Sequence, residues 1–120
     1  MFFRDLKAYQ HARRVAMLSR PLINRLPSSE SDLTDQWRRA ANSIALNLAE
    51  GVTRKGSKEF RRYTDIARGS LHEMEAIVDL VQHLGFFQSS DLEELISARD
   101  ECARTVYGLL RKLSATAAAS

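Results

Sequence analysis

The chain of 120 residues is poor in the residue types that mark secreted, membrane or β-rich proteins. Its single cysteine, Cys102, cannot form an intrachain disulfide, so a reducing, cytoplasmic compartment is expected. No apolar run approaches the ~20 residues that span a bilayer, and the N-terminus lacks the apolar stretch of a signal peptide. Only two prolines, Pro21 and Pro27, and hardly any alternating strand patterns are present, which indicates an all-α chain without a membrane role.

What the chain does have is typical of one globular domain. Hydrophobic residues make up 44% and charged residues 28%, and a chain of this length can bury one core. Neither an internal repeat nor a low-complexity linker divides it. We therefore predict a single domain over residues 1–114, followed by an alanine- and serine-rich, frayed tail over residues 115–120.

The charges are distributed unevenly along the chain. Residues 1–62 hold 13 Lys and Arg against 6 Asp and Glu, whereas residues 63–120 hold 5 against 9. Such asymmetry indicates either a surface that faces a polyanion or charge-complementary packing between subunits. A solvated basic face is the simpler alternative.

Apolar residues recur at spacings of three and four in four successive segments, which predicts four amphipathic helices. Short connections between them predict an up-down-up-down four-helix bundle. The expected helices run from about Phe3 to Arg25, from Asp32 to Lys55–Gly56 and from Ser57 to Gly85, and the last opens with a capping box at Ser90–Glu93. Asp32 and Ser57 are the expected N-caps, with Gly56 as a left-handed C-terminal residue.

The third helix carries more apolar surface than one bundle face needs. A second stripe there, together with an off-face leucine on the second helix, predicts an oligomer interface. Its residues are Leu46, Ile66, Ile77, Leu80 and Leu84. The alternative is a wide core face on the most central helix.

An antiparallel hairpin of the second and third helices would bring arginines and glutamates to the same levels. Facing residue numbers would then add to about 112, which predicts structural ion pairs between the two helices. The residues concerned are Arg38, Arg39, Glu50, Glu73 and Glu75, with Arg54 or Arg62 as the partner of Glu50. A carboxylate cluster for acid–base or metal chemistry is the alternative, but arginine does not deprotonate, which favours ion pairs.

We predict no catalytic residues, metal or cofactor. The three histidines, His11, His72 and His83, are too scattered for a metal site. Glu73-x-x-Ala76 lacks the histidine of the Glu-x-x-His pattern that di-iron bundles use. No serine lies in a nucleophile-elbow or phosphate-loop motif.

Five cations surround the turn between the second and third helices. They are Arg54, Lys55, Lys58, Arg61 and Arg62. Free amide groups at the start of a helix also attract phosphate, so this turn is the predicted nucleic-acid-binding site. Only Tyr63 offers an aromatic ring beside it, so base-specific recognition is not expected.

The segment from Arg38 to Leu71 carries a family signature. RRAANSIALNLAEG, Arg54, Ser57-x-x-Phe60 and IARGSL with Glu73 and Glu75 resemble the four-helix-bundle proteins encoded by intervening sequences in bacterial 23S ribosomal RNA genes. Leu26-Pro27 and Leu84-Gly85-Phe86 extend the similarity over most of the chain. Trp37 departs from it, because an aliphatic residue is expected there. A related branch is the accessory variability protein of diversity-generating retroelements.

The resemblance implies a left-handed bundle assembled as a ring-like homopentamer, but no activity. Nucleic-acid binding is suspected mainly from the basic branch. We therefore expect a non-enzymatic homo-oligomer that binds RNA or DNA with low specificity or acts as a scaffold for a nucleic-acid enzyme. The alternative is a structural or protein-interaction module without a nucleic-acid role, and a small enzyme is the third and least supported option.

Overall fold

The computed structural model describes residues 1–119 and is all-helical over that range. A short 3-10 helix, η1 (Phe3–Asp5), precedes α1 (Lys7–Ile23), and a second one, η2 (Ser28–Glu30), precedes α2 (Ser31–Thr53). The two longest helices follow, α3 (Ser57–His83) and α4 (Ser89–Ala119). The four α-helices are the four that the apolar periodicity predicts.

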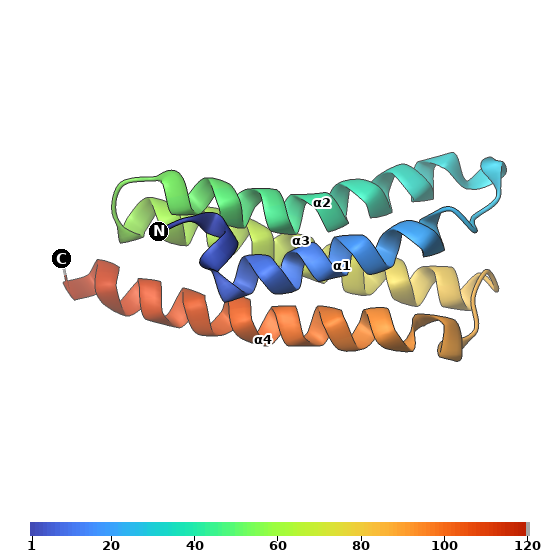
Figure 1. Cartoon of the computed structure of the whole chain (residues 1–120). Coiled ribbons are helices and arrows are strands. Elements are labelled where there is room, and N and C mark those ends of the chain that lie inside the picture. The colour runs from blue at the N-terminus through green and yellow to red at the C-terminus, as the bar shows by residue number, and fades with distance from the viewer. Residues whose placement is uncertain (120) are drawn as a thin grey trace.

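The helices form an up-down-up-down four-helix bundle (Figure 1). Each helix packs against two others, because α1 contacts α2 and α4, and α3 contacts α2 and α4. The bundle measures 49 × 21 × 21 Å. Both chain termini and the α2–α3 turn lie at one end of it, and the α1–α2 and α3–α4 connections lie at the other (Figure 1).

The core follows the predicted stripes closely. Each helix sends one apolar face inward, and burying a leucine-sized side chain contributes roughly 1.5–3 kcal/mol. The largest fully buried side chains are Trp37, Ile23, Ile44, Leu48, Leu71, Met74, Leu92, Leu95, Val15, Val81 and Val106. Trp37 meets the Phe87 ring edge-on, with 5.9 Å between centroids. The indole of Trp37 is therefore part of the core.

The first helix is shorter than predicted because the chain is extended at Leu6, with φ −75° and ψ 119°. This break separates η1 from α1 and lets Phe3 fold back onto Tyr9, with ring centroids 4.9 Å apart. The Gln10 side chain donates a hydrogen bond to the Arg4 carbonyl at 2.7 Å, which ties η1 to the first turn of α1.

The predicted termination of α3 at Gly85 has a clear physical basis, although the last helical residue is His83 and the C-cap is Leu84. Gly85 has φ +88°, a left-handed conformation that favours glycine. The Gly85 amide donates to the Gln82 carbonyl at 3.0 Å, and the Phe86 amide donates to the Val81 carbonyl at 3.1 Å. This pair of hydrogen bonds is the Schellman motif, which satisfies carbonyls at the helix end.

Three predicted caps are wrong in detail. Helix α2 ends at Thr53, and Gly56, with φ 86° and ψ 155°, directly precedes α3 rather than closing α2. Neither Asp32 nor Ser57 is an N-cap, because both residues lie inside their helices: α2 begins at Ser31 and α3 begins at Ser57 itself. The capping box predicted at Ser90–Glu93 is also wrong, because α4 begins at Ser89 and the Asp91 carboxylate accepts a hydrogen bond from the Gln88 amide at 2.9 Å.

The C-terminal segment continues α4. The predicted frayed tail covers residues 115–120, and the helix extends through Ala119. Residue 120 lies outside the described residues.

Candidate nucleic-acid interface

The α2–α3 turn is built on two glycines with different roles. At Gly51 the helices approach so closely that a Cβ atom would lie 2.9 Å from Phe60 Cδ1 and 3.1 Å from Tyr63 Cβ. At Gly56 the positive φ allows the chain to reverse within three residues. The turn is therefore tight, and the cations on both of its sides are held near one another.

Two of the five predicted cations are already paired at the turn. Arg54 pairs with Glu50 one helical turn earlier, as one of the two predicted alternatives has it, and Arg62 pairs with Glu59 at 3.3 Å. The hydrogen bond to Glu50 raises the pKa of the Arg54 guanidinium above its ordinary value. Both guanidinium carbons lie over the Tyr63 ring, at 5.1 and 4.6 Å from its centroid. Tyr63 is thus engaged with protein cations.

The other three cations have no acidic partner within the described residues. Lys55 and Lys58 are exposed beside the start of α3. Arg61 points across to α4, where its Nε donates a hydrogen bond to Ser114 Oγ at 2.7 Å. The structure therefore keeps four of the predicted residues at the turn and directs Arg61 toward the α3–α4 seam.

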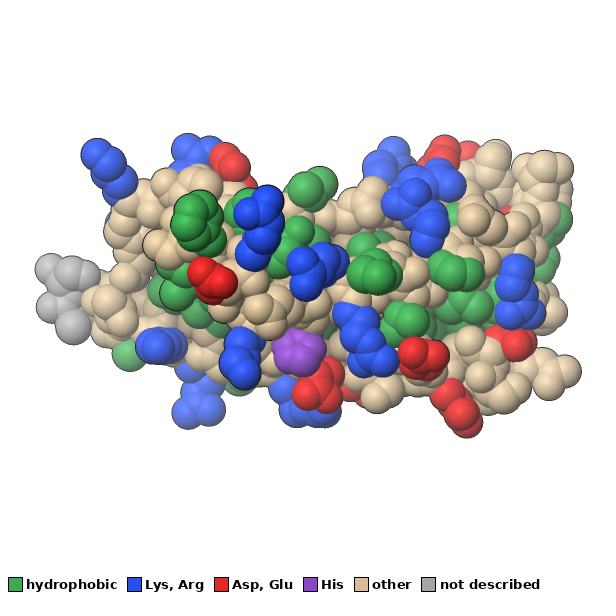
Figure 2. Space-filling view, in the orientation of Figure 1, with side chains coloured by type: hydrophobic (Ala, Val, Ile, Leu, Met, Phe, Trp, Pro, Cys, Tyr) green, Lys and Arg blue, Asp and Glu red, His purple; other side chains and the backbone are tan. Residues whose placement is uncertain are grey.

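The fold sorts charge by bundle end more sharply than the sequence does. The half that contains the α2–α3 turn comprises residues 1–14, 43–70 and 101–119, and it carries 13 Lys and Arg against 5 Asp and Glu. The other half carries 5 against 10. On the visible face, blue side chains gather toward the left end and most red ones lie toward the right (Figure 2). The molecule has a basic half and an acidic half, so a polyanion is attracted to one end only.

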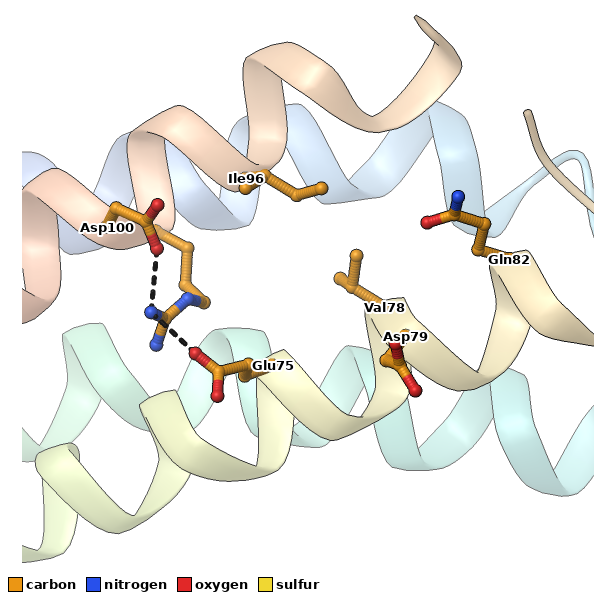
Figure 3. A pocket seen from close by; sticks show the side chains of 7 residues that line it. Glu75, Val78, Asp79, Gln82, Ile96 and Asp100 are labelled. Carbon is orange, nitrogen blue, oxygen red and sulfur yellow. Dashed lines mark hydrogen bonds and ion pairs between the residues drawn. The ribbon is translucent and has the colours of Figure 1, made fainter. Parts of the chain in front are cut away.

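The predicted ion pairs between α2 and α3 do not form among the described residues, and Glu50 pairs with Arg54, the residue that follows α2. Arg38 pairs with Asp35 of its own helix at 3.4 Å. Glu75 faces α4, where it pairs with Arg99 at 2.9 Å at one side of a small pocket of about 150 Å³ (Figure 3).

Helix geometry explains this correction. The Ser43–Ser70 hydrogen bond, at 2.9 Å, shows that the predicted hairpin register is nearly right. Level alone does not bring side chains together, because residues two apart on a helix point about 200° away from each other. Glu73 and Glu75 cannot both face α2. Arg39 and Glu73 are exposed and have no ion pair within residues 1–119.

The predicted apolar stripe is exposed except at one position. Leu46 is 66%, Leu84 54%, Leu80 47% and Ile66 41% exposed. Ile77 is 4% exposed and belongs to the core, so its assignment to an interface is wrong for this chain. Its neighbour Val78 is also buried, which shows that the α3 core face is wide at this level.

Sequence reasoning missed a second cationic feature in the basic half. A groove of about 390 Å³ between α3 and α4 is lined by Arg61, Asp65, Arg68, Tyr107, Leu110, Arg111 and Ser114. The groove depends on the α3–α4 register, in which Arg61 lies against Ser114, and the sequence alone does not specify that register.

Other kinds of site find no support in the part of the chain that is described. Residues 1–119 contain no group of three or more His, Cys, Asp or Glu side chains that could hold a metal ion. None of the helices there is long and apolar enough to cross a membrane.

Comparison with known protein families gives a match over most of the chain. The family model described as 23S rRNA-intervening sequence protein matches residues 4–108, which is most of the chain. No curated protein matches the chain. The matched range includes the α2–α3 turn, the exposed apolar residues and most of α4.

Proposed function

Because the chain belongs to the 23S rRNA-intervening sequence protein family, we propose that it is a non-enzymatic, homo-oligomeric bundle whose basic end associates with nucleic acid. This family is not known for enzymatic activity. The association has low sequence specificity and takes place in the cytoplasm. The bundle either acts alone or is a scaffold for a nucleic-acid enzyme. The observation that carries the proposal is the separation of charge into a basic and an acidic half.

Phosphate contacts are the interaction that such a surface makes best. Lys55 and Lys58 are exposed and unpaired within the described residues, so a phosphate can reach them without first breaking an ion pair. Each phosphate that a lysine or arginine neutralises releases counterions, which makes the binding sequence-independent and strongly dependent on salt. In a ring-like oligomer this turn would be repeated in every subunit, and the weak phosphate contacts would add through avidity.

Self-association rests on the exposed apolar stripe. Leu46 and Ile66 lie at one level of the α2–α3 hairpin, and Leu80 and Leu84 extend the stripe along α3. Arg39 lies seven residues before Leu46 and Glu73 seven after Ile66, so both charged residues share the face of the stripe. A second copy can cover the apolar side chains and pair with both charges. The family resemblance implies a homopentamer as the assembled form.

Nucleic-acid association is tested by fluorescence anisotropy with labelled RNA and DNA of unrelated sequences at several salt concentrations. We expect similar affinities for all sequences and a steep loss with salt. The double variant Lys55→Glu/Lys58→Glu should weaken the binding of every probe about equally. It should also reduce the slope of log binding constant against log salt concentration (the salt slope) by about 2, one for each lost phosphate contact. The control Arg20→Glu/Arg38→Glu makes the same charge change in the acidic half and should have a smaller effect.

The second candidate function is a protein-interaction module without a nucleic-acid role. It is favoured by the pairing of Arg54 and Arg62 with neighbouring glutamates, which lowers the charge available at the turn. Absence of binding at tens of micromolar protein in low salt would leave this function and contradict the first. Sedimentation equilibrium tests self-association separately, and a monomer at micromolar concentration would contradict it.

A further inference from the structure

The α3–α4 groove combines cations with an accessible aromatic ring, a pairing that the α2–α3 turn lacks. Tyr107 is 59% exposed, and within the described residues no cation–π or ring–ring contact involves it. It lines both the groove of about 390 Å³ and an adjoining pocket of about 250 Å³, which also shares Arg68. The ring therefore stands between two hollows along the seam of α3 and α4.

The cations of the groove are only partly neutralised. Arg68 pairs with Asp65, the one carboxylate in the lining, at 2.9 Å. Arg111 has no acidic partner in the described part of the chain, and Arg61 is held by the neutral hydroxyl of Ser114. The groove thus keeps two positive charges that nothing acidic in its lining balances, next to one free phenol ring.

We propose that this groove binds single-stranded nucleic acid, with a phosphodiester held by Arg61 and Arg111 and the adjacent base stacked on Tyr107. The inference rests on the proposed function and adds a site that the turn itself does not provide. Guanidinium groups match the geometry of phosphate oxygens, and every base has a π-face that stacks on an aromatic ring. A duplex hides its base faces, so the groove selects single strands.

The position of the groove fits a path from the turn. Arg61 lies on the first turns of α3, next to Lys58 and the α2–α3 connection, and its side chain reaches α4 at Ser114. A strand that contacts the turn through its phosphates can continue directly into the groove. Farther along the same seam the lining becomes acidic, with Glu75, Asp79 and Asp100, so the strand is confined to the basic half.

The test is anisotropy with a labelled short oligouridylate and with an abasic phosphodiester oligomer of the same length and charge. Tyr107→Leu should weaken binding of the oligouridylate by about fivefold or more, which is the effect expected for one stacked base, and leave binding of the abasic oligomer unchanged. Tyr107→Phe keeps the ring and should bind like the unmodified protein. Arg111→Gln should weaken both probes and lower the salt slope by about 1, whereas the adjacent Lys112→Gln, which is outside the groove lining, should change both less.

A photochemical measurement locates the base independently. An oligonucleotide with 5-iodouridine, irradiated in the complex, should cross-link to Tyr107, and mass spectrometry of the α4 peptide should show it. The groove proposal would be overturned if Tyr107→Leu weakened the binding of both probes equally, or if cross-links were confined to Tyr63 and the turn. Either result would leave the proposed function standing. Absence of binding by any probe would overturn both.

Discussion

The guanidinium of Arg99 on α4 lies 2.9 Å from the carboxylate of Glu75 on α3, while only 12% of the Arg99 side chain is exposed. The same guanidinium pairs with Asp100 at 2.7 Å and donates a hydrogen bond to the Leu71 carbonyl at 3.2 Å. Glu75, by contrast, is 63% exposed. The two partners of this ion pair therefore make very different contributions to the folded state.

We expect Arg99→Ala to destabilise the bundle more than Glu75→Gln. Loss of Glu75 removes one mostly exposed pair, worth ~1 kcal/mol or less, and leaves Arg99 bound to Asp100. Loss of Arg99 removes every one of its hydrogen bonds and the packing of its methylene stem, for about 1–3 kcal/mol. Urea unfolding of both variants measures the difference. An equal or larger effect of Glu75→Gln would contradict this reading of the contact.

The Cys102 thiol should be unreactive in the folded protein. Cys102 is fully buried, and this burial raises its pKa to about 12. We expect a thiol reagent such as DTNB to react at pH 8 only after urea is added. The raised pKa also contributes stability that is present below about pH 9, the ordinary range of a thiol, and is lost as the pH rises toward about 12. Cys102→Ala should reduce that alkaline loss, and prompt labelling of the native protein would contradict the burial.

The Asp91 carboxylate should make stability depend on acid pH. The Gln88 amide and then the Arg25 guanidinium lower the pKa of Asp91 below its ordinary value of about 3.9. A lowered pKa contributes stability that is present above about pH 4 and is lost as the pH falls through the folded-state pKa. Thermal unfolding between neutral and acid pH should therefore show a smaller acid loss in Asp91→Asn. Parallel pH profiles of variant and unmodified protein would exclude this role, and Glu94→Gln on the same helix is the matched control.

The sequence was sufficient for the helices and for most of the core. Periodic apolar residues at Val15, Ile44, Leu71 and Val106 specify buried faces because helical spacing determines direction relative to the core. Gly85 marks a helix end because its left-handed conformation costs other residues more.

Pairing between surface residues was less predictable. Arg39 and Glu73 share a level of the α2–α3 hairpin but do not pair, because level does not determine which way long side chains point. The groove at Tyr107 depends on the α3–α4 register, which the connection after Gly85 sets through contacts such as the Gln82–Ser89 hydrogen bond at 2.8 Å. Those contacts become visible only in three dimensions.

The last prediction concerns Arg39 and Glu73 in the proposed self-association. If a second copy covers the apolar stripe, each charge lies at that interface, where an opposite charge stabilises and a like charge repels. Arg39→Glu or Glu73→Arg alone should weaken association by about tenfold or more. The double variant Arg39→Glu/Glu73→Arg exchanges the two charges and should restore most of it.

The monomer itself provides the control for these variants. Arg39 and Glu73 are exposed and make no ion pair within residues 1–119, so each change should alter unfolding of the monomer by ~1 kcal/mol or less. Sedimentation equilibrium measures association, and urea unfolding under dissociating conditions measures the monomer. Leu80→Asp, which places a charge within the stripe, should also dissociate the assembly because it would bury an unpaired carboxylate. Association that survives Leu80→Asp and both single reversals would show that another face of the bundle joins the subunits.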